Sequence, residues 1–404
     1  MSQPARAIAP SHPQLEQAKE HLRALIGFDT VSKNPNRPLI EHMAVHFRKL
    51  GAEITLVPDE SGQKGNLVAR FGPEDQPGVV LSGHTDVVPA NEETWLTPPF
   101  SMDERDGRLY GRGACDMKGF AACVMAAAPT FAAADLKRPL YLCFSYDEEV
   151  GCLGAPDIAR HLAALPVPPE LAIIGEPSMM KLVTGQKGKI AMRAQVTGTS
   201  GHSSFAPEHV NAIEYAAQAI AKISERGQRY EVEGPFDADF TVPHATMLAT
   251  MIEGGVATNV TPESCGFTFE LRSISEMDPD ADMAKLLAEI ESDVGVPMAE
   301  KVAGTGITFE RIFAYPAMGE ARNTAGFTRY AHLLPEWGGK VSYGSEGGVF
   351  EQIGGIPSVI VGPGSIAQAH RPNEYVELDQ LGLCVDFLRD IIGYLAEQPA
   401  AASA

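Results

Sequence analysis

The sequence places histidine and acidic side chains directly after four short apolar runs. The runs cover residues 78–83, 140–145, 171–174 and 357–361. The polar residues that follow them are His84 and Asp86, Glu148 and Glu149, Glu176, and, beyond a glycine-rich loop, His370. A further loop, 111–119, places Asp116 just before an apolar segment. Carboxylates that converge on one point repel one another unless some protonate or a cation lies between them. These residues therefore indicate a cation site.

The mixture of donor atoms narrows the kind of cation. Imidazole and carboxylate ligands without a thiolate suit Zn²⁺, Co²⁺ or Mn²⁺. Two divalent ions need about five protein ligands when one carboxylate bridges them. Five candidates are His84, Asp116, Glu149, Glu176 and His370. Glu148 then remains next to a ligand, free to act on water as a general base. Asp86, two residues after His84, is suited to hold the imidazole ring.

Each motif has a more ordinary interpretation when it is taken alone. A single histidine at a strand end is usually solvated, and Asp-Glu-Glu and Gly-Glu-Pro segments are usually exposed turns. Their placement after successive strands favours one common site, because ligands of open α/β sheets lie beyond the carboxyl ends of the strands.

The elements that must position these residues can be predicted from apolar spacing. Near-continuous apolar runs are typical of strands in a sheet covered on both faces. Helical spacing predicts helices at 14–27, 39–50, 118–128, 157–164 and 378–396. Strands that alternate with helices indicate an α/β fold with a largely parallel sheet covered by helices. We assign residues 1–186 and 315–404 to this catalytic, metal-binding domain.

Residues 187–314 show a different pattern. Polar and apolar residues alternate in predicted strands at 189–196, 245–253, 264–273 and 306–314, with helices predicted at 208–226 and 278–293. The order β-α-β-β-α-β is the ferredoxin-like α+β arrangement. We interpret this segment as a domain inserted into the first, which a fold tolerates when the ends of the insert lie close together.

Composition limits the classes of partner. The 404 residues include 32 Lys and Arg against 52 Asp and Glu, a formal net charge of −20. So acidic a protein repels phosphate backbones and anionic lipids, which disfavours nucleic acids and membranes as partners. Six cysteines without a Cys-x-x-Cys pair are too few for a disulfide framework and predict reduced thiols. The first residues also lack the apolar segment of a signal peptide. We therefore expect a cytoplasmic protein that acts on a small molecule.

Five motifs together resemble the co-catalytic zinc aminoacylase/carboxypeptidase family, the M20-type metallohydrolases. The motifs are Ser82-Gly-His-Thr-Asp86, Gly111-Arg-Gly-Ala-Cys-Asp-Met-Lys-Gly119, Asp147-Glu-Glu149, Gly175-Glu-Pro177 and Ala369-His-Arg-Pro-Asn-Glu374. They follow in order along nearly the whole chain. Segments 144–154, 201–204, 269–272 and 362–366 most resemble the acetylornithine deacetylase branch of that family. Cys115 departs from the Ala, Ser or Thr expected there.

The resemblance implies roles for the candidate ligands. Asp116 is expected to bridge two divalent ions, Zn or Co. One ion would add His84 and Glu176, and the other would add Glu149 and His370. Glu148 would be the general base, and Asp86 would support His84.

The resemblance also gives the inserted domain a role as a lid that mediates a homodimer. His202 is expected to enter the active site of the partner subunit, and Asn259 and Arg272 to hold the substrate. Taken alone, His202 is interpreted as an exposed loop histidine and Arg272 as part of a buried ion pair. Glu346, in the segment 344–348, is expected to shape the specificity pocket, with a flexible glycine turn as the alternative.

The resemblance implies metal-dependent hydrolysis of the N-acetyl amide of N²-acetyl-L-ornithine to L-ornithine and acetate, a step of arginine biosynthesis. Alternatives are succinyl-diaminopimelate desuccinylase, a broad N-acyl-amino-acid amidohydrolase and an aminopeptidase of the same architecture. A succinyl group would need an additional cation near the acyl pocket, and the sequence identifies none. A metal-free scaffold on the same fold is disfavoured, because all five candidate ligands and Glu148 are present.

Overall fold

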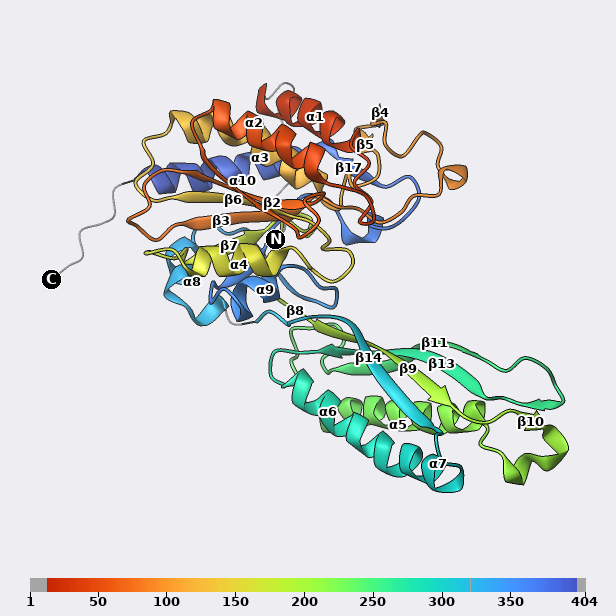
Figure 1. Cartoon of the computed structure of the whole chain (residues 1–404). Helices are drawn as coiled ribbons and strands as arrows, with labels where there is room; N and C mark the ends of the chain where they lie inside the picture. The colour runs from red at the N-terminus through yellow and green to blue at the C-terminus, as the bar shows by residue number, and fades with distance from the viewer. Residues whose placement is uncertain (1–12, 320, 398–404) are drawn as a thin grey trace, which may run out of the picture. The chain divides into compact units, whose positions relative to one another are not determined.

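The computed structural model describes residues 13–319 and 321–397 (Figure 1). The chain divides into two compact units. Unit 1 comprises Met1–Gly185, Gly319–Gly339 and Ser345–Ala404, and unit 2 comprises Gln186–Met318 and Lys340–Gly344. The predicted insert 187–314 lies within unit 2, which also includes Gln186, residues 315–318 and the separate segment 340–344.

Unit 1 is organised around an eight-stranded sheet. In spatial order its strands are β1 (Glu53–Pro58), β2 (Gly65–Phe71), β6 (Leu140–Ser145), β3 (Val79–His84), β7 (Leu171–Ile174), β16 (Ser358–Ile360), β8 (Leu182–Gln186) and β15 (Trp337–Val341). The four central strands, β6, β3, β7 and β16, are mutually parallel. β2 pairs antiparallel with β6, and β8 pairs antiparallel with β16. The sheet is therefore largely parallel where the predicted site residues emerge.

Helices cover both faces of this sheet (Figure 1). On one face lie α1 (Pro13–Ile26), α2 (Arg37–Lys49), α3 (Lys118–Ala133) and α10 (Leu378–Ala396); on the other lie α4 (Ala155–Ala163) and α9 (Gly347–Gln352). Every residue of α3 from Lys118 to Ala128 is buried. Beyond Lys118 the segment is apolar on all sides, which is typical of a helix buried in the core. The α/β class predicted from alternating strands and helices is confirmed.

The amphipathic helix α2 shows how local sequence sets these elements. Its buried residues are Leu39, Ile40, Met43, Ala44 and Phe47, spaced by three or four so that they form one stripe. Proline in the first turn costs no helical hydrogen bond there. Gly51 follows the helix with a φ of 90°, a left-handed conformation that favours glycine and ends the helix.

Unit 2 has a four-stranded antiparallel sheet in the order β11 (Thr246–Gly254), β13 (Ser264–Ser273), β9 (Gly188–Thr197) and β14 (Gly306–Tyr315). Alternate residues of β13 are buried, as expected when one face packs on a core. Helices α5 (Ala212–Glu233) and α6 (Pro279–Ile290) contact this sheet. The element order is β-α-β-β-α-β.

Two predicted helices of this unit differ in their bounds. The helix expected at 208–226 begins at Ala212, because Asn211 caps it by accepting hydrogen bonds from the backbone N–H groups of Ile213 and Glu214. It then continues to Glu233, where Gly234 has a φ of 75°. The helix expected at 278–293 ends at Ile290, and a π-helical turn over Glu291–Gly295 leads into α7 (Val296–Lys301).

A small third sheet matters for the site. It joins β17 (Tyr375–Glu377), β5 (Arg108–Tyr110) and β4 (Asp103–Arg105). β17 pairs antiparallel with β5, with Tyr375 opposite Tyr110. This pairing brings the loop that follows β5 beside the loop that precedes β17, and these two loops carry Asp116 and His370.

The remaining named elements are short. They are β10 (Gly201–His202), β12 (Val260–Thr261), α8 (Ala325–Tyr330) and the 3-10 turns at Glu92–Thr94, Ser203–Glu208, Ala321–Asn323 and Ile366–Gln368. All six cysteines are buried and none forms a disulfide. Among residues 13–319 and 321–397, no helix combines the length and the apolar character that crossing a membrane requires.

Candidate metal centre

His84 is the last residue of β3, and its imidazole is buried at the carboxyl end of the parallel strands. Its Nδ1 atom lies 2.9 Å from the backbone carbonyl of Asp86 and 3.5 Å from Oδ1 of that residue. Its Nε2 atom lies 3.0 Å from Oδ1 of Asp116 and 3.7 Å from Oε1 of Glu176. Asp86 is thus the partner of Nδ1, whereas Nε2 faces the carboxylates of Asp116 and Glu176.

Asp116 lies between the two predicted histidine ligands. Oδ1 of Asp116 faces His84, whereas Oδ2 lies 3.4 Å from Nε2 of His370. The same nitrogen of His370 lies 2.9 Å from Oε2 of Glu149. One carboxylate with an oxygen toward each histidine is the arrangement required of a bridging ligand.

Two groups of side chains in the described residues could each hold a metal ion. They are His84, Asp116 and Glu149, and His84, Glu148 and Glu176, with ligand atoms of each group within 4.8 Å of one another. The second group includes Glu148, which the sequence analysis assigned to proton transfer rather than to ligation. Oε2 of Glu148 lies 4.0 Å from Nε2 of His84. The geometry therefore brings the five predicted ligands and Glu148 together.

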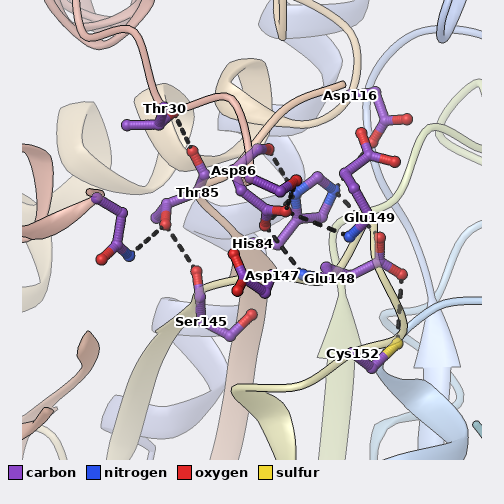
Figure 2. A network of polar contacts seen from close by, with 12 residues as sticks. Thr30, His84, Thr85, Asp86, Asp116, Ser145, Asp147, Glu148, Glu149 and Cys152 are labelled. Carbon is purple, nitrogen blue, oxygen red and sulfur yellow. Dashed lines mark hydrogen bonds and ion pairs between the residues drawn. The ribbon is translucent and has the colours of Figure 1, made fainter. Parts of the chain in front are cut away.

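The carboxylate of Asp86 anchors the loop that carries the two glutamates (Figure 2). Its Oδ1 accepts a 3.0 Å hydrogen bond from the backbone N–H of Glu148, and its Oδ2 accepts one of 3.3 Å from that of Glu149. Ser32 donates to Oδ2 at 2.7 Å. Asp86 therefore fixes both a histidine and the Glu148-Glu149 backbone. Asp86 contacts the backbone of the two glutamates and the ring of His84, and it is not among the candidate ligands.

Burial and mutual repulsion shift the protonation of this cluster. Burial raises the pKa of Glu148 and of Glu176 well above its usual value. Burial, with the nearby Asp116, raises the pKa of Glu149 to about 7. Hydrogen bonds to Asp116 and Glu149 raise the pKa of His370 to about 10. Burial opposes the change at Asp116, but hydrogen bonds from His370 and His84 lower the pKa of that carboxyl. A buried set of imidazoles and competing carboxylates fits divalent cations, because their positive charge removes the repulsion.

Glu148 has one further contact. The thiol of Cys152 lies 3.4 Å from Oε1 of Glu148, and both residues belong to the loop after β6 (Figure 2). The φ of Cys152 is 57°, a conformation uncommon for residues other than glycine.

Glu346, expected to shape the specificity pocket, is buried within unit 1. Its side chain is fully buried, and its carboxylate accepts hydrogen bonds from Ser82 on β3, at 2.9 Å, and from Ser145 on β6. The carboxylate has no surface open to a substrate. It ties two adjacent strands together because two neighbouring serine hydroxyls supply the partners that a buried carboxylate needs.

The other predicted substrate residues belong to unit 2. His202 is exposed, and its Nδ1 accepts a hydrogen bond from the backbone N–H of Ser204. The backbone carbonyl of Asn259 accepts a 3.1 Å hydrogen bond from the N–H of Ser203, so the two segments lie side by side. Arg272 contacts Oε1 of Glu270 at 3.0 Å and the hydroxyl of Tyr315 at 2.9 Å. Their roles toward a substrate stay predictions.

Two buried charged residues near Asp116 were not predicted from the sequence to belong to the surroundings of the site. Glu374 and Arg112 form an ion pair of 2.8 Å. Glu374 is the last residue of the motif at 369–374. Its position in that motif does not indicate that its carboxylate points toward the loop at 111–116. Lys118, the first residue of α3, donates a hydrogen bond to the backbone carbonyl of Phe28 at 2.9 Å. Burial lowers the pKa of Lys118 to about 7.

Comparison with known proteins shows which family this chain belongs to. The model of peptidase family M20/M25/M40 matches residues 80–394. The chain belongs to this family. A relative named acetylornithine deacetylase, from Pasteurella multocida (strain Pm70), is 33% identical over 387 residues, 95% of this chain and 98% of that protein. Another of the same name, from Klebsiella pneumoniae (strain 342), is 34% identical over 366 residues, 89% of this chain and 92% of that protein.

Solved structures of M20 enzymes share the fold. A metallo-carboxypeptidase of the family from Sulfolobus solfataricus has a TM-score of 0.73 at 17% identity, covering 94% of this chain and 99% of that one. A dinuclear metal-binding peptidase of the family from Bacillus subtilis has a TM-score of 0.65 at 16% identity, covering 96% and 99%. The resemblance inferred from the five motifs is thereby confirmed, and the M20 chain described here is a metal-dependent hydrolase.

Proposed function

We propose that this M20 hydrolase cleaves the N-acetyl amide of N²-acetyl-L-ornithine, giving L-ornithine and acetate, as a cytoplasmic step of arginine biosynthesis. The observation that carries the hydrolytic centre is Asp116, whose two oxygens face His84 and His370. The choice of substrate is supported by relatives named acetylornithine deacetylase that match this chain along 89–95% of its length.

The proposed centre holds two divalent ions, zinc or cobalt. His84 and Glu176 would hold one, Glu149 and His370 the other, and Asp116 both. When bound, such ions supply Lewis acidity toward water and toward the amide carbonyl. Asp86 contributes by fixing the ring of His84 and the backbone of Glu148 and Glu149.

Glu148 is the proposed general base. Its buried carboxylate accepts a proton from the attacking water and later delivers it to the nitrogen of the breaking C–N bond. Burial raises the pKa of this carboxyl above its usual value. The products are then a carboxylate and an amine, with the atoms of one water divided between them.

We further propose a homodimer formed through unit 2, in which His202 of each subunit enters the site of the other. Leu248, Met251 and Ile252 on the edge strand β11, and Val256 beyond it, are exposed apolar residues in support of such an interface. Asn259 and Arg272 would hold the α-carboxylate of the substrate. The guanidinium suits a carboxylate because it donates in a fixed fork.

The test is release of the free amine by the zinc- or cobalt-loaded protein. N²-acetyl-L-ornithine and N-succinyl-diaminopimelate are compared at equal concentration, with Glu148→Gln as the background control. A clear preference for acetylornithine supports the proposal. A preference for the succinyl compound, or for other N-acyl amino acids, would overturn the substrate and keep the metal centre.

A further inference from the structure

The carboxylate of Glu374 is surrounded by hydrogen-bond donors. Its Oε1 accepts from the backbone N–H groups of Cys115, at 2.9 Å, and Asp116, at 3.0 Å. Its Oε2 accepts from the backbone N–H of Gly113, at 3.0 Å, and from Nη1 of Arg112, at 2.8 Å. The residue is 1% exposed. Four donors, all from the loop that presents Asp116, therefore converge on one buried side chain.

The backbone of Glu374 joins the same two segments. Its carbonyl accepts a 3.0 Å hydrogen bond from the N–H of Gly111, at the point where β17 pairs with β5. Four residues before Glu374 the same loop carries His370, whose φ is 63°. The side chain and the backbone of one residue thus fix the loop of Asp116 against the loop of His370.

Arg112 extends this connection. Its Nη2 lies 3.3 Å from the carbonyl of Pro89, and its Nη1 lies 3.4 Å from the carbonyl of Arg371, next to His370. The guanidinium carbon also lies 5.2 Å from the ring centre of Trp95. A planar fork that reaches three segments cannot be replaced by the single ammonium group of lysine.

We propose that Glu374 is a positioning residue that sets the affinity of the ion held by Asp116, Glu149 and His370. The proposal rests on the metal centre of the proposed function and is independent of the substrate. Glu374 orients Asp116 through the backbone N–H of that residue and holds its loop at the distance from His370 that a shared ion requires. Residues behind a metal ligand typically change metal affinity 10- to 100-fold when they are replaced.

The shape of the interaction makes Glu374→Gln a sharp test. All four partners donate, so both oxygens of the carboxylate must accept. Glutamine has the same size, but its amide NH₂ would face two N–H donors and leave them without an acceptor. The change therefore displaces one edge of the 112–116 loop without creating a cavity.

A matched control is available in Glu170. Its carboxylate also accepts from several side chains, namely Arg138 at 3.2 Å, Arg329 at 3.1 Å and Tyr330 at 3.0 Å. None of these residues belongs to the candidate metal centre. Glu170→Gln therefore breaks a comparable ion-pair network and reports what general loss of stability does to metal binding.

The experiment titrates the metal-free full chain with Co²⁺ and follows its visible absorption and the bound stoichiometry. The wild type should bind two ions. Glu374→Gln should weaken one ion at least tenfold relative to the other, and Glu170→Gln should leave the ratio of the two affinities unchanged. If Glu374→Gln fails to fold, Arg112→Lys is used and should weaken the same ion relative to the other.

Three results would overturn the proposal. They are an unchanged ratio of affinities in Glu374→Gln, an equal loss of both ions, and the same shift in Glu170→Gln. A wild type that does not bind two Co²⁺ ions would remove the metal centre itself. Failure to hydrolyse acetylornithine would leave the Co²⁺ result intact, so the two proposals fail separately.

Discussion

The backbone N–H of Glu148 donates a 3.0 Å hydrogen bond to Oδ1 of Asp86. Asp86 also presents its backbone carbonyl to Nδ1 of His84. A predicted metal ligand and the proposed base therefore share one anchor, although they follow different strands of the sheet. Because Asp86 holds the backbone of Glu148, we expect that the side chain of Glu148 can be changed without moving the neighbouring ligands.

Glu148→Gln should reduce kcat by about 10³-fold or more, because the amide cannot accept the proton. The variant should still bind two metal ions, measured by elemental analysis after dialysis. Glu60→Gln, a change at an exposed glutamate, serves as the control and should leave both quantities unchanged. Turnover close to that of the wild type in Glu148→Gln would remove this residue from the role.

Removal of metal by a chelator should abolish hydrolysis, and Zn²⁺ or Co²⁺ should restore it. It should also lower the Tm, since ligands that bind only the folded chain stabilise it. Each ion present at 1,000 times its Kd contributes about 4 kcal/mol. Thermal unfolding at increasing Zn²⁺ concentration measures this effect. A Tm that does not respond to metal would contradict a buried centre of this composition.

His202→Ala should abolish activity without changing metal content if the residue acts in the partner's site. Mixing this variant with inactive Glu148→Ala, under conditions that exchange subunits, should restore activity. Half of the dimers are then mixed, each with one complete site, so about a quarter of the wild-type activity is expected. No recovery despite proven exchange would argue against a site shared between subunits.

Arg272→Met should raise KM for the acyl amino acid by about 10- to 100-fold, the worth of one charge-assisted hydrogen bond to a carboxylate. The Co²⁺ stoichiometry should stay at the wild-type value. A substrate analogue whose carboxylate is replaced by an amide should be cleaved equally well by both proteins. If the variant instead loses discrimination only in the acyl group, Arg272 contacts the other end of the substrate.

Stability should fall as the pH drops from about 6.5 to 4 because of His21. The ring of His21 packs edge-on against that of His46, with centroids 4.8 Å apart. Burial, followed by the nearby His46 and His42, lowers the pKa of His21 to about 4. The unfolded chain therefore binds this proton at a higher pH than the folded chain does.

The corresponding measurement is urea unfolding of the metal-free protein between pH 7 and pH 4, so that metal release does not contribute. His21→Gln should reduce the slope of stability against pH in this interval. His161→Gln, a change at a partly exposed histidine of α4, should not. Parallel curves for His21→Gln and the wild type would rule out the assignment.

The sequence was sufficient to predict the central strands and the convergence of the carboxylates. β6 and β7 are buried at every residue, so their apolar runs are unmistakable. Two of the strands that were not predicted, β1 and β15, are partly exposed and carry polar residues. Their strand conformation depends on pairing with neighbours, which a single-sequence pattern does not contain.

Glu346 and Glu374 show why the surroundings of the site were harder to predict. Both are glutamates in polar, glycine- or proline-containing segments, where exposure is the ordinary expectation. Each is buried because donors from distant segments surround it, two serines for Glu346 and the 112–116 loop for Glu374. Spacing along the chain can align residues on one element, but it cannot indicate which segments fold over them.

Gln186 and Met318, at the two ends of unit 2, are hydrogen-bonded to each other through both backbone N–H groups, at 3.0 and 3.1 Å. The long segment of unit 2 therefore begins and ends at one antiparallel bridge, and the separate segment 340–344 belongs to the same unit. Because its two ends are held together there, this long segment can vary in length without changing the distance between the residues of unit 1 that flank it.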